Sequence, residues 1–175
     1  MRSVPNILTA FRIILVPVFL FLVADGELYW ATIVFVTAGA TDAVDGLIAR
    51  AFDVKTETGA ILDPLADKLL LSSAYLMLTY IGLIPLWLCI PVIFKDLVLL
   101  SGFSMFKRAG RTVDIRPSVW GKLTTALQIA TIIYAMAISS GGAAFLSLAA
   151  LTAAVTTYTG FDYAWREIKA QTGGG

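Results

Sequence analysis

The sequence predicts an all-α membrane protein with six transmembrane helices, and three observations lead to this fold class. Hydrophobic residues make up 58% of the chain and the mean hydropathy is +0.84, outside the usual range of soluble proteins. The 175 residues suffice for about six spans of roughly 20 residues with short connections. Connections that contain Lys or Arg alternate with connections that contain neither, as is typical of polytopic membrane proteins.

The elements follow one another in a simple order. A polar start, residues 1–6, places Pro5 ahead of the first helix, and Tyr29 with Trp30 would anchor the second helix at the membrane interface. The predicted spans are residues 7–24, 29–51, 59–80, 85–106, 118–138 and 143–164. Turns are expected at residues 25–27, around Gly82 and at 139–142, and polar loops at 52–58 and 107–117.

The distribution of basic residues predicts the orientation. The turns after the first, third and fifth spans contain no Lys or Arg. The ends of the chain and the other two connections carry Arg2, Arg50, Lys55, Lys107, Arg108, Arg111, Arg116, Arg166 and Lys169. By the positive-inside rule, both termini face the cytoplasm of a cell inner or plasma membrane, and the number of spans is even.

The remaining composition limits the possible chemistry. The chain has no His, which excludes a histidine base or metal ligand, and Cys89 alone excludes an intrachain disulfide. We expect Cys89 to be a buried, inert thiol. We expect one domain over residues 1–175 with a disordered tail at 171–175, and the first apolar stretch to be a retained span. The net charge of +1 indicates no particular partner, and we expect no nucleic acid.

Four acids in an otherwise apolar region form the candidate site. Asp42 and Asp45 are three residues apart and Asp63 and Asp67 four apart, so each pair shares one face of a helix. Asp42 lies about 12 Å deeper than Arg50 along its helix. Four carboxylates near a bilayer are costly unless they are neutralised, and one or two divalent cations would do so.

The types of residue indicate which cations and which reaction. Aspartates without histidine suit Mg²⁺, Mn²⁺ or Ca²⁺ better than Zn²⁺. Two such cations favour phosphoryl transfer, Arg50 could pair with a phosphate, and one acid could act as a general base. The residues thus predict a metal-dependent site for a phosphorylated ligand just below the cytoplasmic surface. An ion or proton pathway is the main alternative, although no second acidic cluster or inverted repeat is evident. A scaffold of buried salt bridges is a weaker alternative, because the buried bases are too few.

The pattern D-x2-D-G-x2-A-R-x8-G-x3-D-x3-D resembles the signature of the CDP-alcohol phosphotransferases. All eight positions match, at Asp42, Asp45, Gly46, Ala49, Arg50, Gly59, Asp63 and Asp67. The segments NILTAFRIILVPVF, DPLADK and GKLTTALQ extend the resemblance over most of the chain.

The resemblance implies six transmembrane helices, a homodimer and a polar cavity open to the cytoplasm. It implies that Asp42, Asp45, Asp63 and Asp67 bind Mg²⁺ or Mn²⁺, with Asp67 also serving as the catalytic base. Gly46, Ala49 and Gly59 would flank the cytidine, and Arg50 and Thr56 would contact the diphosphate. Pro5, Asn6, Ile7 and Leu8 would border the CDP-lipid. An acceptor hydroxyl would attack the lipid-side phosphorus of CDP-diacylglycerol, and CMP would leave.

The acceptor alcohol is less clearly specified. The whole chain resembles phosphatidylglycerophosphate synthases, which use glycerol 3-phosphate, and Lys95, Lys122 and Arg116 are candidates to bind its phosphate. Lys95-Asp96 replaces the Arg-Glu pair usual in those synthases, and Thr124 replaces a usual Lys. The segment LTYIGLIPLWL, Asp96 and the run RPSVWGKLTTALQ instead resemble cardiolipin synthases, which use phosphatidylglycerol. We place glycerol 3-phosphate slightly ahead of phosphatidylglycerol, and inositol phosphate or serine behind both.

Overall fold

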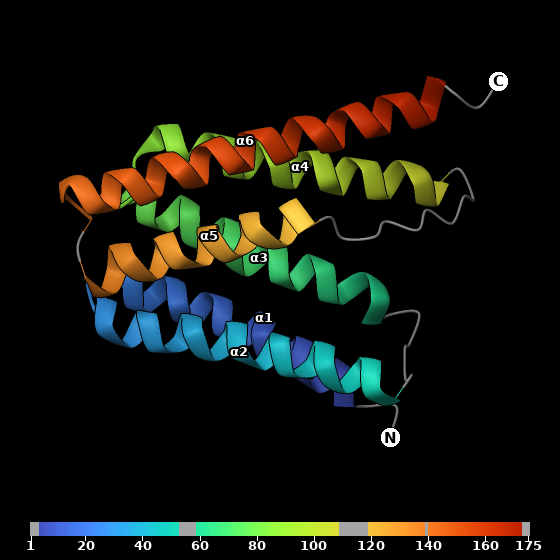
Figure 1. Ribbon diagram of the computed structural model, residues 1–175. Helices are drawn as coiled ribbons and strands as arrows, with labels where there is room; N and C mark the ends of the chain where they lie inside the picture. Colours follow the sequence, from blue (N-terminus) through green and yellow to red (C-terminus); the bar gives the residue numbers. More distant parts are fainter. Residues whose placement is uncertain (1–3, 53–58, 109–118, 139, 173–175) are drawn as a thin grey trace. The chain divides into compact units, whose positions relative to one another are not determined.

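All regular structure in the described part of the chain is helical (Figure 1). The computed structural model describes residues 4–52, 59–108, 119–138 and 140–172, and side chains over 14–41, 68–100, 119–138 and 140–165. The helices are α1 (Val4–Ala24), α2 (Leu28–Phe52), α3 (Gly59–Tyr80), α4 (Leu86–Arg108), α5 (Val119–Ala137) and α6 (Gly142–Thr172). The predictions of an all-α chain and of six helices are thereby confirmed over these residues.

The helix boundaries follow the predicted spans closely except at the end of α6. This helix continues to Thr172, whereas the prediction ended the span at 164 and placed residues 171 and 172 in a disordered tail. The prediction ended the helix where the apolar residues end. However, the segment WREIKAQ contains mostly good helix formers and no Gly or Pro, so the backbone can remain helical beyond the apolar part. Residues 173–175 lie outside the described part.

Glycine ends α1 as the sequence predicts. Gly26 has φ +81°, and its N–H donates to the carbonyl of Val23 at 3.2 Å. The N–H of Glu27 donates to the carbonyl of Leu22 at 2.9 Å. These two bonds define a Schellman cap, which requires a left-handed residue that glycine adopts without strain. The cap stops α1 and lets α2 begin within a few residues.

The chain consists of two units, and residues 1–82 form the first. In this unit α1 contacts both α2 and α3, and α2 also contacts α3. The rings of Phe19 and Phe35 pack with centroids 5.7 Å apart. Ala31, Ala38 and Ala74 are fully buried, and such small residues allow helices to approach closely. The unit therefore brings together the helices that carry the candidate acids.

Residues 83–175 form the second unit, in which α6 contacts both α4 and α5. In Figure 1, α4 and α6 lie side by side over most of their lengths. Cys89 is buried and free, as predicted. The buried residues of this unit include polar and charged side chains, namely Lys95, Asp96, Thr124, Gln128, Thr131, Thr152, Thr156 and Thr159. The interior of the unit is thus partly polar.

One helical segment of the described residues, Gly142–Trp165, is long and apolar enough to cross a membrane. Two shorter apolar segments, Ile14–Ala24 and Leu28–Thr41, belong to α1 and α2. Large apolar side chains are exposed on both units, among them Phe21, Tyr80, Ile90, Phe161 and Trp165. Such extensive apolar exposure suits contact with lipid better than contact with water.

Candidate active site

The four signature aspartates lie on two helices of the first unit. Asp42 and Asp45 are in α2, and Asp63 and Asp67 are in α3. The backbone is helical at all four positions, as the three- and four-residue spacings require if each pair is to share a face. Their side chains lie outside the described residues. Their convergence on a metal therefore stays a prediction.

The other signature positions lie on the same two helices. Gly46, Ala49 and Arg50 are in α2, and Gly59 is the first residue of α3. The predicted CDP-lipid residues Pro5, Asn6, Ile7 and Leu8 are in the first turns of α1, which contacts both signature helices. The side chains of these eight residues are not among those described, and Thr56 and Arg116 lie outside the described residues altogether.

The described side chains by themselves offer no metal site. Over residues 14–41, 68–100, 119–138 and 140–165, no group of three or more His, Cys, Asp or Glu side chains could hold a metal ion. The signature aspartates are not in this set. Their donor chemistry, carboxylate oxygen without histidine, fits Mg²⁺ or Mn²⁺.

In the second unit, a polar junction links α4, α5 and α6. The Lys95 ammonium donates to Oε1 of Gln128 at 3.1 Å and lies 3.4 Å from Oδ1 of Asp96. Nε2 of Gln128 donates to Oγ1 of Thr156 at 3.3 Å. Lys95 and Asp96 are only 2% and 3% exposed, and Gln128 and Thr156 are fully buried. We call these four residues the Lys95 junction.

Two threonine pairs flank the Lys95 junction along α5 and α6. The hydroxyls of Thr124 and Thr159 are 2.9 Å apart, and those of Thr131 and Thr152 are 2.8 Å apart. With Gln128 between Thr124 and Thr131, the polar residues of α5 recur at i, i+4 and i+7. This is the spacing of one helix face. In α6 they recur with the same spacing, so two antiparallel polar stripes meet.

The two hydroxyls of the Thr124–Thr159 pair make three close contacts with oxygen atoms but have only two protons to donate. Besides their mutual contact, Thr124 lies 2.8 Å from the carbonyl of Trp120 and Thr159 lies 2.7 Å from that of Val155. A carbonyl only accepts, so the three contacts need three protons, while two hydroxyls supply two. At any moment one contact lacks a proton. The pair is therefore an adaptable link between helices, whereas the Lys95–Gln128 bond has a fixed donor and acceptor.

The two described acceptor candidates occupy different environments. Lys95 belongs to the buried junction, whereas Lys122 is exposed. With 3.6 residues per turn, Lys122 lies about 160° around α5 from Thr124 and about 120° from Gln128. Lys122 can therefore reach a ligand from outside the polar stripe. Lys95 is buried and already contacts Gln128 and Asp96.

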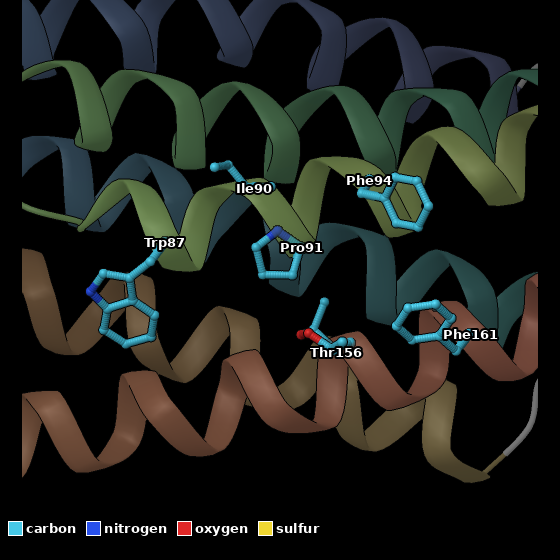
Figure 2. Close-up of a pocket in the computed structure, with 8 residues that line it drawn as sticks. Trp87, Ile90, Pro91, Phe94, Thr156 and Phe161 are labelled. Carbon is cyan, nitrogen blue, oxygen red and sulfur yellow. The ribbon is translucent and has the colours of Figure 1, made fainter.

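A pocket of about 320 Å³ lies between α4 and α6 (Figure 2). Trp87, Ile90 and Phe94 line it from α4, and Phe161 lines it from α6. Its lining contains no charged residue, so it offers no positive charge to a phosphate. The pocket meets the Lys95 junction at Thr156, which also lines it.

A family comparison identifies the class of protein to which this arrangement belongs. The profile of the CDP-alcohol phosphatidyltransferases matches residues 2–159. The chain belongs to this family. The matched range contains both signature helices of the CDP-alcohol phosphatidyltransferase and the whole Lys95 junction.

Individual relatives carry two kinds of name. A probable phosphatidylglycerophosphate synthase of Mycobacterium tuberculosis is 34% identical over an alignment of 178 positions, gaps included, which covers 95% of this chain and 82% of the relative. The CDP-diacylglycerol–glycerol-3-phosphate 3-phosphatidyltransferase of Bacillus subtilis is 34% identical over 144 residues, 74% of each chain. The CMP-forming cardiolipin synthase of Rattus norvegicus is 30% identical over 194 residues, 98% of this chain and 64% of the relative.

Sequence reasoning missed Gln128 and Thr156 as residues of the candidate site. Polar residues at i, i+4 and i+7 in two apolar segments were the available signal, because such a stripe in an apolar helix needs a polar partner. The structure also explains Thr124, which replaces a Lys usual in the resembling synthases. This position is fully buried in a threonine pair, which leaves less room for the longer Lys side chain.

Proposed function

We propose that this protein transfers the phosphatidyl group of CDP-diacylglycerol to a hydroxyl of glycerol 3-phosphate and releases CMP. The observation that carries the proposal is the 34% identity with the Mycobacterium tuberculosis synthase across 95% of this chain. The Bacillus subtilis relative bears the name of the same reaction. Membership in this transferase family also argues against the alternative of an ion or proton transporter.

The proposed reaction is a displacement at phosphorus. Asp67 accepts the proton of the acceptor hydroxyl, and the hydroxyl oxygen bonds to the lipid-side phosphorus. The bond between this phosphorus and the oxygen that bridges to the CMP phosphorus breaks. CMP leaves with the electron pair of that bond, so atoms and charge balance. Arg50 and Thr56 are proposed to contact the diphosphate, with Gly46, Ala49 and Gly59 beside the cytidine.

We further propose that Asp42, Asp45, Asp63 and Asp67 hold Mg²⁺ or Mn²⁺. The donor set supports this, because carboxylate oxygens are the ligands these ions prefer. When bound, such ions neutralise charge on the phosphate oxygens and on the leaving group. Pro5, Asn6, Ile7 and Leu8, at the start of α1, are proposed to border the CDP-lipid.

For the acceptor phosphate we propose the cations Lys95, Lys122 and Arg116. Lys122 is exposed and carries a mobile ammonium group that can approach a phosphate as a point charge. Lys95 adds a positive charge inside the helix bundle. Arg116 lies outside the described residues and is proposed from the sequence alone.

Cardiolipin synthesis, with phosphatidylglycerol as acceptor, is the second candidate. It is favoured by the 30% identity with the rat cardiolipin synthase across 98% of this chain. Lys95 followed by Asp96, in place of an Arg-Glu pair, supports the same candidate. Both acceptors present an anionic phosphate next to a free hydroxyl, so the same cations would serve either one.

The proposal includes six membrane spans, cytoplasmic termini and active-site cavity, and a homodimer. The distribution of Lys and Arg supports the orientation, and the exposed apolar side chains support lipid contact. The Lys95 junction and the threonine pairs of the second unit support membrane spans, because membrane helices commonly associate through Thr, Gln and small residues. The homodimer is proposed from the family resemblance.

The decisive experiment is CMP release by purified protein from CDP-diacylglycerol. Glycerol 3-phosphate, phosphatidylglycerol, inositol phosphate and serine are offered one at a time, and the lipid product is identified by mass spectrometry. We expect phosphatidylglycerophosphate with glycerol 3-phosphate. Cardiolipin from phosphatidylglycerol alone would establish the second candidate. Ion flux through liposomes without any CMP release would contradict both.

A further inference from the structure

Of the two described contacts of the Lys95 ammonium, with Gln128 of α5 and with Asp96 of α4, the contact with Gln128 is the shorter. Lys95 and Asp96 are neighbours in sequence, and successive residues of a helix do not face each other. Their 3.4 Å separation exceeds the roughly 2.7–2.9 Å of a strong charge-assisted hydrogen bond. The contact with Gln128 is shorter, at 3.1 Å. A neutral amide is thus the closer of these two partners, and the carboxylate is the looser one.

Gln128 is itself held at both ends. Its Oε1 accepts from the ammonium, which has donors but no acceptor, so Nε2 must be the end that points to Thr156. The amide orientation is therefore fixed by chemistry. The threonine hydroxyl on α6 holds Gln128, and Gln128 on α5 holds Lys95 on α4. On α6, Gly160 lies beside Lys95, where an added Cβ would be 3.6 Å from the Lys95 Cβ, so α4 and α6 approach closely here.

A buried ion pair is weak evidence for stability, because desolvation offsets the attraction between the charges. The threonine pairs on either side link α5 to α6 without any charge, and the bond from Lys95 to Gln128 adds α4. Ionisable residues inside membrane proteins are rare and usually functional. The cost of burying Lys95 and Asp96 together is therefore consistent with a functional use in addition to helix association.

We infer that Asp96 and the acceptor phosphate compete for the Lys95 ammonium, while Gln128 holds that ammonium in place as a positioning residue. The inference deepens the proposed function and rests on it, since it describes how the same transferase binds its acceptor. A phosphate monoester or diester takes the place of the Asp96 carboxylate at the ammonium, and its binding free energy has to offset the cost of leaving that carboxylate without the cation. Gln128 and Thr156 remain bonded, so the ammonium does not have to be reoriented.

The inference predicts shifts of opposite sign at two residues of the same junction. Gln128→Met keeps an unbranched side chain but removes the bond to Lys95, and Asp96→Asn removes the competing charge with little change in shape. Losing one hydrogen bond to a charged group should raise the acceptor KM roughly tenfold or more in Gln128→Met. The acceptor KM should fall in Asp96→Asn, while the KM for CDP-diacylglycerol stays within about twofold of wild type in both variants.

Thr156→Val and Thr152→Val form a matched control pair, one turn apart on α6. Thr156→Val loosens Gln128 and should raise the acceptor KM several-fold, whereas Thr152→Val breaks a threonine pair and should change only Tm. Thr156→Val also serves if Gln128→Met does not fold, because it leaves Lys95, Asp96 and Gln128 unchanged. If Gln128 and Thr156 had a purely structural role, Thr156→Val and Thr152→Val would lower Tm to a similar extent and leave the acceptor KM unchanged.

All KM values are measured with purified full-length protein in lipid–detergent micelles, with glycerol 3-phosphate and with phosphatidylglycerol as separate acceptors. Changes of the same sign in Gln128→Met and Asp96→Asn, or no change in either acceptor KM, would overturn the inference. Failure of the wild type to release CMP with either acceptor would instead overturn the proposed function. The two failures are therefore distinguishable.

Discussion

Removing Lys95 alone should destabilise the protein far more than removing Lys95 and Asp96 together. In Lys95→Met the Asp96 carboxylate, only 3% exposed, loses the ammonium at 3.4 Å, and Oε1 of Gln128 loses a donor at 3.1 Å. Removing one member of a buried ion pair costs about 3–5 kcal/mol. For a chain of this size, roughly 2–4 °C of Tm corresponds to each kcal/mol, so Tm should fall by about 6–20 °C.

In Lys95→Met/Asp96→Leu both charges of the pair are removed, and replacing a buried pair by apolar residues is often close to neutral. The double variant should therefore recover most of the lost Tm, although Gln128 still lacks its donor. Thermal unfolding in detergent, followed by the fluorescence of the four tryptophans, measures the difference. Leu97→Met, at a 59% exposed position of the same helix, is the control and should leave Tm nearly unchanged.

The result that would refute this reasoning is an equal loss of Tm in the single and double variants. It would mean that Lys95 and Asp96 contribute by packing and not as a charge pair. A single variant as stable as wild type would show that the ammonium is not the counter-charge that Asp96 needs.

Asp67→Asn should lower transfer by at least about a hundredfold, the usual contribution of a general base, while CDP-diacylglycerol still binds; near wild-type turnover would exclude the base role. Treatment with EDTA should abolish CMP release and added Mg²⁺ or Mn²⁺ should restore it, and activity that persists after thorough chelation would contradict the metal site. Lys122→Ala should raise the KM of the acceptor more than that of CDP-diacylglycerol, and an unchanged acceptor KM would remove Lys122 from the acceptor site. Because Cys89 is buried, single cysteines can report topology: an impermeant maleimide should label Glu27→Cys in intact cells but Lys55→Cys only after permeabilisation, and the reverse pattern would invert the orientation.

The sequence alone determined the class of fold and the location of the candidate site. Six apolar stretches separated by turn residues specify six helices, because both the apolar runs and the turns are local properties of the chain. Gly26 illustrates this, since a left-handed cap after an apolar run depends only on its immediate neighbours. The eight signature positions likewise lie within 26 residues and could be recognised without any tertiary information.

The end of α6 shows a limit of this kind of reasoning. Hydropathy marks where a helix stops being apolar, but the backbone stays helical as long as the residues favour it. The segment beyond 164 is polar and nevertheless helical to Thr172.

Only the tertiary structure decided what Lys95 and Lys122 contact. In the sequence both are basic residues within predicted apolar spans, and both are equally plausible ligands for a phosphate. The packing of the helices buries Lys95 against Gln128 of another helix and leaves Lys122 exposed. The reason is geometric: periodicity shows which residues share a helix face, but the neighbour that this face meets depends on how separate helices pack.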